Sequence, residues 1–275
     1  MEIPLTGLPA TGPSSFLSSY GDALFDLADG VSVADAADVI LRGNAGSEAE
    51  REFVRAGLQE AADREHISRE EVDELLDADN PVITHGVANW KLTRALASLL
   101  DRRVKGASGA TVALVTRDVY RYLRDPGIGN RINDGVRKAL TADTEMVVVG
   151  HSLGSVVAYA LLAHQGEAAR WKVPLLLTLG CPLAVTVIRN ALAPIAHPTV
   201  VAHWHNARDP ADIVALHPLI APHFDIKPAV EHSDHVSNGT DNRHGIEGYL
   251  SDQTVARRIH DALISIASLS LVPSN

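Results

Sequence analysis

The 275-residue chain is predicted to adopt an α/β fold in which a mostly parallel sheet is flanked by helices, with a helical region at the N-terminal end. Beyond residue 145, short apolar runs alternate with helical patterns, as a parallel sheet with crossover helices requires. Residues 15–105 instead show charged, helical patterns. At 46% apolar residues, this length is enough for one sizeable core. We therefore expect one domain, 1–275, in which residues 15–105 form a cap or a flanking layer.

The front of the chain contains several helical patterns. Residues 1–14 are rich in Pro, Gly, Thr and Ser and are predicted to form a loop. Ser68 and Glu71 form a capping box, because the side chain of each residue can accept a hydrogen bond from the backbone N–H of the other. A short acidic helix should follow to about Leu76. The other helices expected in this region cover residues 15–29, 32–43, 47–62 and 89–100.

Two segments before residue 145 are less regular. Residues 81–86 could form a short strand that ends in His85-Gly86. Residues 110–124 are ambiguous, since their first half is β-branched while their second half favours a helix. Residues 130–140 show the pattern of an amphipathic helix.

The central motif lies at residues 145–158. The apolar run that ends at Gly150 predicts a buried strand, and Leu153 begins an apolar helical pattern. The chain therefore turns sharply at Ser152, in a G-x-S-x-G pattern whose tight turn favours glycine at 150 and 154. Such a turn exposes the serine hydroxyl, and the Leu153 N–H at the helix start can face an oxyanion. The alternative is a serine that merely caps the helix.

The segment 149–154, Val-Gly-His-Ser-Leu-Gly, resembles the nucleophile elbow of α/β-hydrolases of the lipase and esterase type. This resemblance implies an α/β-hydrolase-like fold and a catalytic serine, acid and histidine in that chain order. It also implies hydrolysis of a small-molecule or lipid-like ester without a cofactor. His151 is expected to point away from the reacting hydroxyl and to serve in packing.

After the elbow, strands and helices alternate regularly. The helix from Leu153 should continue to His164, and a last amphipathic helix over 253–269 presents Val255 and Ile259 on one face. Between them we expect strands at 173–179 and 199–205 and a helix at 184–191.

The candidate acid lies in the loop after the strand at 199–205. Ligands bind at the carboxyl ends of parallel strands, so this loop should lie beside the elbow. Asp212-Ile213-Val214 resembles the D-x-V signature of many lipases, whereas Asp209 matches an alternative spacing of the loop. We favour Asp212, because Asp209 precedes Pro210 and has the pattern of a turn former or a partner of Arg208.

His244 is the preferred base among thirteen histidines. It occupies a polar, glycine-containing loop before the last helix, and its segment resembles the H-x-x-x-x-Y-L pattern of lipase-like relatives. His232 and His235 are the alternatives. With His203 and His205 they also form the chain's most metal-like cluster, but the spacing matches no metal motif, so we predict no metal.

The sequence does not assign a second oxyanion donor. His85-Gly86 resembles the oxyanion-loop dipeptide of many lipases, but it follows a long helical region and runs directly into another helical pattern. A second function class therefore stays open, namely a hydrolase-like interaction or scaffold module that lacks a complete oxyanion hole.

The composition limits the classes of partner and the location that we expect for the protein. A formal charge of −10 and a pI near 5.7 disfavour nucleic acid. We see neither a signal-peptide pattern nor an apolar run long enough to span a membrane. The single cysteine, Cys181, precludes an internal disulfide and is expected to be an inert buried residue. These features predict a cytoplasmic protein with no integral membrane segment, and they do not indicate its oligomeric state.

Overall fold

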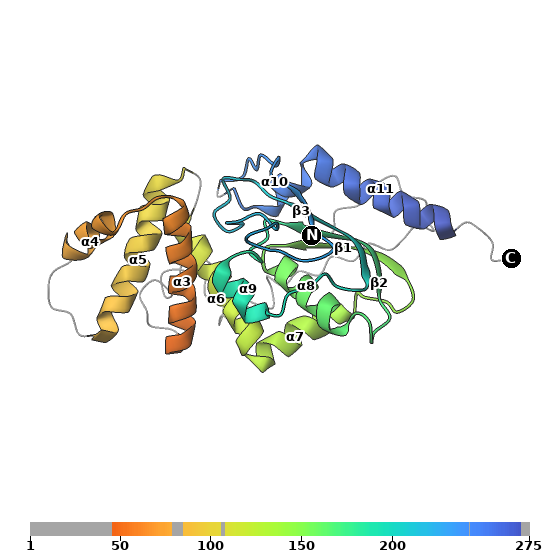
Figure 1. Ribbon diagram of the computed structural model, residues 1–275, viewed down its shortest axis with the longest axis horizontal. Helices are drawn as coiled ribbons and strands as arrows, with labels where there is room; N and C mark the ends of the chain where they lie inside the picture. Colours follow the sequence, from red (N-terminus) through yellow and green to blue (C-terminus); the bar gives the residue numbers. More distant parts are fainter. Residues whose placement is uncertain (1–45, 79–84, 106–107, 242, 271–275) are drawn as a thin grey trace.

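The computed structural model describes residues 46–78, 85–105, 108–241 and 243–270, and a parallel sheet forms its centre (Figure 1). The four strands lie in the order β1-β2-β3-β4, and each neighbouring pair is parallel. Their bounds are β1 Glu145–His151, β2 Lys172–Leu179, β3 Val201–Ala207 and β4 Glu231–Ser233. Helices flank this sheet and also make up the N-terminal region, so the predicted α/β fold class is confirmed.

Helices cover both faces of the sheet. In Figure 1, α7 and α8 lie on one side of the strands and α11 on the other, while α3, α4 and α5 lie together at one end. The N-terminal helices are α3 Glu48–Arg64, α4 Arg69–Ala78 and α5 His85–Arg103. The remaining helices are α6 Gly109–Arg124, α7 Pro126–Arg137, α8 Leu153–Gln165, α9 Thr186–Leu192, α10 Ile246–Leu250 and α11 Gln253–Ser270.

The core has two parts because successive strand residues point to opposite faces of the sheet. The larger part runs from Leu58 on α3 through α6 and α8 to Leu176 on β2. The smaller part lies on the other face, where Leu177 packs with Val255 and Ile259 of α11. The predicted apolar face of the last helix therefore contacts the sheet at Val255 and Ile259.

The capping box predicted for α4 is present. The backbone N–H of Glu71 donates to the Ser68 hydroxyl at 3.2 Å, and the backbone N–H of Ser68 donates to the Glu71 carboxylate at 2.8 Å. Two N–H groups at the helix start are satisfied in this way. The short helix is thus fixed by its own sequence at the point where it begins.

The ambiguous segment at 110–124 is a helix, α6. Val112, Thr116 and Val119 are buried at helical spacing, and Thr116 lies so close to α3 that a Cβ at Gly57 would meet it at 3.0 Å. Packing against α3 and α5 therefore outweighs the β propensity of this β-branched segment. The Ser108 side chain also caps the helix by accepting from the Thr111 N–H.

Other boundaries differ from the sequence-based expectation. Helix α7 begins at Pro126, a favoured residue in the first turn, and ends at Arg137, before the predicted residue 140. The short elements β4 and α10 are additional to the predicted ones. His85 and Gly86 begin α5 rather than ending a strand. The predicted elements at 15–29, 32–43 and 81–84 lie outside the described residues.

Helix α3 contacts the start of α9 and the loop that follows β3. The Glu60 carboxylate accepts from the Thr186 backbone N–H and lies 2.8 Å from the His217 ring nitrogen Nε2. The Arg64 guanidinium donates to the carbonyl oxygens of Pro210 and Leu216. The N-terminal region is therefore attached to the loop that contains Asp212.

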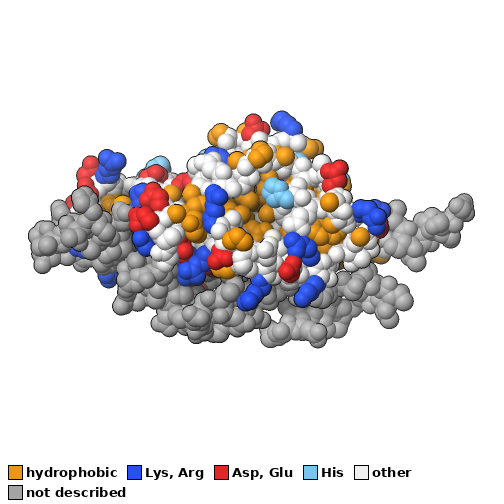
Figure 2. Space-filling model, turned by 90° about the horizontal axis from the view of Figure 1, so that it is seen from below, with side chains coloured by type: hydrophobic (Ala, Val, Ile, Leu, Met, Phe, Trp, Pro, Cys, Tyr) orange, Lys and Arg blue, Asp and Glu red, His pale blue; other side chains and the backbone are white. Residues whose placement is uncertain are grey.

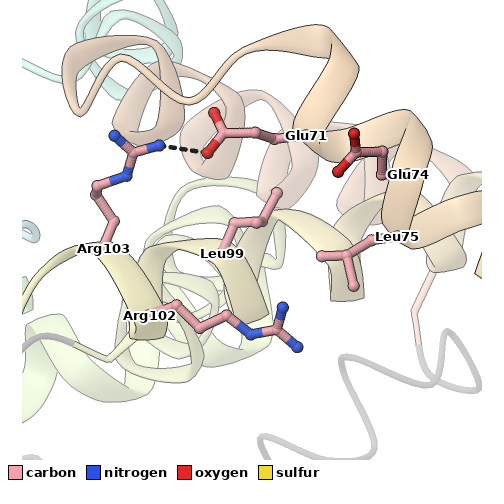
Figure 3. A pocket seen from close by; sticks show the side chains of 6 residues that line it. All are labelled: Glu71, Glu74, Leu75, Leu99, Arg102 and Arg103. Atoms are coloured by element: carbon pink, nitrogen blue, oxygen red, sulfur yellow. Dashed lines mark hydrogen bonds and ion pairs between the residues drawn. The ribbon is translucent and has the colours of Figure 1, made fainter.

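Two surface features complete the fold. A cleft of about 480 Å³ between α4 and α5 is lined by Leu75, Leu99, Glu74, Arg102 and an ion pair between Glu71 and Arg103 (Figure 3). On the face seen in Figure 2, acidic and basic side chains are interspersed around apolar ones.

Among the helices of the described residues, none has the length and apolar character that crossing a membrane requires.

Candidate active site

The predicted turn at Ser152 is a strained one. Strand β1 ends at His151, helix α8 begins at Leu153, and Ser152 between them has φ 52° and ψ −126°. A side-chain-bearing residue in this region costs about 1–3 kcal/mol, and such strain persists only where the surrounding structure imposes it. A Cβ at Gly150 would lie 2.8 Å from the Gly154 carbonyl oxygen and from the Ser155 Cα, so glycine is required there. At Gly154 a Cβ would meet none of the described atoms within 4 Å, so the expected need for glycine at that position was wrong.

Three predicted side chains meet at the turn. The His244 Nε2 lies 2.8 Å from the Ser152 Oγ, and the His244 Nδ1 lies 2.7 Å from the Asp212 Oδ2. The exposed fractions are 9% for Ser152, 6% for His244 and 0% for Asp212. Because a carboxylate only accepts, Nδ1 carries the proton and Nε2 is left to accept the serine O–H. The site therefore holds a serine aligned with a histidine that can act as its base.

The parallel sheet explains why these segments meet. His151, Leu179 and Ala207 lie side by side at the carboxyl ends of β1, β2 and β3. The Ser152 N–H continues this register by donating to the Leu179 carbonyl at 3.0 Å. Asp212 follows β3 in the next loop, so the site lies at the sheet edge where parallel α/β folds bind ligands.

The Asp212 carboxylate is held by several donors. Its Oδ1 accepts from the backbone N–H groups of Val214 at 2.9 Å and Ala215 at 3.3 Å, and its Oδ2 accepts from the Tyr249 hydroxyl at 2.6 Å. Burial alone would raise the pKa of Asp212. The adjacent His244 and the hydrogen bonds from His244, Tyr249 and the Val214 N–H outweigh burial and lower the pKa of Asp212 below its ordinary value.

Asp209 has a different position. Its Oδ1 accepts from the Ala211 N–H at 2.8 Å and its Oδ2 from the Asn238 N–H at 2.8 Å, so it is the turn former that the sequence suggested. Arg208 was the other partner considered for Asp209, but its guanidinium pairs with Asp234 at 2.6 Å instead. Of the two candidate acids, the structure brings Asp212 to His244.

The Leu153 N–H is the predicted oxyanion donor. It lies at the N-terminus of α8, a helix of 13 residues, where backbone donors and the helix dipole favour negative charge. Among the described residues, none accepts a hydrogen bond from it. The other candidate, His85-Gly86, lies in the first turn of α5.

His151 contacts the base directly and Gly180 lies close to it, which the sequence did not predict. His151 was expected to serve in packing away from the hydroxyl, and it packs against His244: the ring centroids are 4.8 Å apart and its Nε2 donates to the His244 carbonyl at 2.7 Å. Burial lowers the pKa of His151 to about 4, with the neighbouring His244 acting in the same direction. Gly180 has φ 53°, and a Cβ there would lie 3.2 Å from the His244 Cε1. The available signal in the sequence was that Gly180 directly follows a predicted strand, at the edge of the sheet where the site lies.

The alternative histidines lie elsewhere. His232 bonds to Asn206 and Asp234, each at 2.9 Å, and His235 is exposed. His203 and His205 share a face of β3, where each Nδ1 lies just under 4 Å from the Glu231 carboxylate. Within the described ranges, no group of three or more histidine, cysteine or acidic residues is arranged to hold a metal ion.

Replacing His205 with leucine should reduce the sensitivity of the fold to acid. Neither His205 ring nitrogen has a hydrogen-bond partner among the described residues, and its side chain is 4% exposed. Burial, together with the charge of Arg258, lowers the pKa of His205 to about 4. At a pH between the ordinary pKa of 6.5 and the folded-state pKa of about 4, His205 binds a proton in the unfolded chain but not in the folded chain. The histidine should therefore cost about 2 kcal/mol of stability at pH 5 relative to pH 7.

The measurement is urea unfolding of wild type and His205→Leu at pH 7 and pH 5. The difference in unfolding free energy between the two pH values should be smaller in the variant. An identical loss in both proteins would show that His205 is protonated in the folded state.

No protein-family model, curated protein or solved structure matches this chain. The likeness to α/β-hydrolases therefore remains a resemblance of motifs. What bears on function is the contact of Ser152, His244 and Asp212 at the carboxyl edge of the sheet.

Proposed function

We propose that the protein is a serine hydrolase that cleaves carboxylic esters through an acyl-enzyme. The observation that supports this proposal best is the continuous hydrogen-bonded chain from the Ser152 hydroxyl through the His244 ring to the Asp212 carboxylate. A serine is a weak nucleophile unless an adjacent base removes its proton, and this arrangement supplies an oriented base.

Each residue has one task in the proposed reaction. The Ser152 Oγ attacks the ester carbonyl carbon while the His244 Nε2 takes its proton, and the carbonyl oxygen becomes an oxyanion beside the Leu153 N–H. The intermediate collapses when His244 returns the proton to the leaving alkoxide, so that an alcohol departs and the acyl group stays on Ser152. Water then repeats the sequence and releases the carboxylic acid. Asp212 holds the ring tautomer and stabilises the imidazolium.

Structural cost favours catalysis over a scaffold role. A strained backbone at Ser152 and a fully buried carboxylate at Asp212 both reduce stability unless another part of the structure offsets them. Neither feature is needed to present a binding surface. Both are needed to aim a hydroxyl at a substrate and to orient its base. The preference for esters over amides rests on the resemblance of the elbow to lipases and esterases.

A fluorophosphonate probe should label the purified protein on Ser152. The probe reacts with a serine only where a base activates the hydroxyl, so labelling should be lost in Ser152→Ala and retained in Ser265→Ala, an exposed serine on α11. Peptide mapping by mass spectrometry identifies the modified residue. A folded wild-type protein that takes up no label, or a label found on another residue, would contradict the proposal.

A further inference from the structure

The Tyr249 hydroxyl is a buried polar group that the mechanism above does not use. We propose that Tyr249 is a positioning residue, which holds the Asp212 carboxylate and shares its charge so that the His244 ring is correctly oriented to accept the Ser152 proton. This inference rests on the proposed function and adds Tyr249 to the three residues of the proposed triad.

The geometry assigns a direction to each hydrogen bond. The Tyr249 Oη accepts from the Asp209 backbone N–H at 3.3 Å, which leaves the hydroxyl proton for its other neighbour. That neighbour is the Asp212 Oδ2 at 2.6 Å, the same oxygen atom that accepts from the His244 Nδ1. With the two backbone donors on Oδ1, four donors surround the carboxylate, which matches its number of lone-pair sites. Three of them fix the carboxylate, and the fourth is His244.

The surroundings keep the tyrosine in place and protonated. Its side chain is fully buried in the smaller core part, and its ring lies so near Gly180 that a Cβ there would meet the Tyr249 Cε2 at 3.0 Å. Burial, followed by the negative charge of Asp212, raises the pKa of Tyr249 far above its ordinary value. The hydroxyl is therefore a donor to Asp212 at every working pH.

The shared oxygen gives this role a distinct signature. A charge-assisted bond from Tyr249 draws negative charge from the atom that faces the His244 ring. Without that bond, Oδ2 attracts the imidazolium more strongly, and His244 takes up a proton at higher pH. The carboxylate also loses one of its fixing donors. Removal of the hydroxyl should therefore slow the chemical step and move the acidic limb of the activity profile to higher pH.

The other ionisable groups around the Asp212–His244 pair are present in the wild type and in both variants. They are His151 beside the His244 ring, Glu247 near His151, Arg64 near the Asp212 carboxylate, Asp209 near the Tyr249 hydroxyl, and Arg243, which lies 3.8 Å from Asp209. His151 is neutral above about pH 4, because burial lowers its pKa to about that value. A shift of the acidic limb above pH 5 thus reports on the pair itself.

The test compares Tyr249→Phe with Tyr159→Phe. Both tyrosines are buried, and the Tyr159 hydroxyl also bonds to backbone, at Ala196 in the loop between α9 and β3, rather than to a triad residue. For Tyr249→Phe we expect kcat to fall roughly 10- to 100-fold, as for a small misplacement of a catalytic group. The acidic midpoint of the kcat/KM profile should rise by about half a pH unit or more. For Tyr159→Phe we expect neither change.

The outcomes are separable. A folded Tyr249→Phe protein with the wild-type kcat and pH profile overturns the inference. The inference also fails if Tyr249→Phe lowers kcat without a pH shift and Tyr159→Phe lowers kcat to the same extent. If Tyr249→Phe does not fold, 3-fluorotyrosine placed at position 249 alone keeps the shape and strengthens the donor, and the acidic midpoint should then move to lower pH. An unchanged midpoint would again overturn it.

Failure of the proposed function would look different. A wild-type protein that neither takes up the fluorophosphonate nor hydrolyses p-nitrophenyl acetate contradicts the hydrolase proposal itself. The His244 ring can then be followed by NMR across the same pH range. The pH at which its signal changes should still rise in Tyr249→Phe, and an unchanged value would reject the role of Tyr249 independently of catalysis.

Discussion

Replacing Ser152 with alanine is expected to lower kcat for ester hydrolysis by about 10⁶-fold, because no acyl-enzyme can form without the hydroxyl. The remaining rate should come from substrate binding and the Leu153 N–H alone. KM should change little, since the hydroxyl gains its bond to the substrate only during the reaction. Turnover of p-nitrophenyl acetate, with protein concentration checked by absorbance, measures the loss.

Ser152→Gly provides the matched comparison for this prediction. It should be as inactive as Ser152→Ala, but more stable by about 1 kcal/mol, because glycine adopts the φ of 52° without steric cost. Equal stability of the two variants would argue against strain at the turn. A loss of activity below about tenfold in either variant would mean that another group is the nucleophile.

The elbow could be predicted from sequence because it is local. Strand, turn and helix are contiguous over residues 145–165, and the need for glycine at position 150 follows from contacts within that stretch. Chain order and the resemblance to lipases then limited the search for Asp212 and His244 to two loops. A contiguous motif together with a rule of order was enough to identify the residues that meet.

Contacts between distant segments could not be predicted in the same way. Tyr249 reaches Asp212 only when the loop after β3 and helix α10 lie side by side, and no periodicity in either segment specifies this. His151 at the end of β1 packs against His244 in the loop before α10, although the two residues are far apart in the chain. These contacts depend on side-chain directions across the sheet edge, which a single sequence does not reveal.

Short elements escaped prediction for a related reason. Strand β4 has three residues and α10 has five, and neither is long enough to show a period. Strand β4 exists because its backbone pairs with β3 at His205, Asn206 and Ala207. Pairing with β3, rather than any periodicity within residues 231–233, makes this segment a strand.

Asp212→Asn is expected to lower kcat by about 10⁴-fold, the loss typical of a triad whose histidine is left free to adopt the wrong tautomer. The structure gives a specific reason for so large an effect. Both Asp212 oxygens accept from donors, so an asparagine must direct its NH₂ either at the N–H groups of Val214 and Ala215 or at Tyr249 and His244. Either orientation places donor against donor. The orientation that spares the two backbone N–H groups directs the NH₂ at the His244 Nδ1–H, so the ring loses the acceptor that fixes its tautomer.

Asp209→Asn should have a contrasting result, and this contrast is the decisive comparison. Asp209 also accepts two backbone N–H groups, from Ala211 and Asn238, so the variant should lose about 1–3 kcal/mol of unfolding free energy. Its carboxylate does not bond to His244, so kcat of the folded fraction should fall by roughly tenfold or less. Each variant is unfolded in urea and then assayed under conditions where it is fully folded. Equal losses of kcat would mean that both carboxylates orient the histidine, and a larger loss at Asp209 would transfer the role of the acid to that residue.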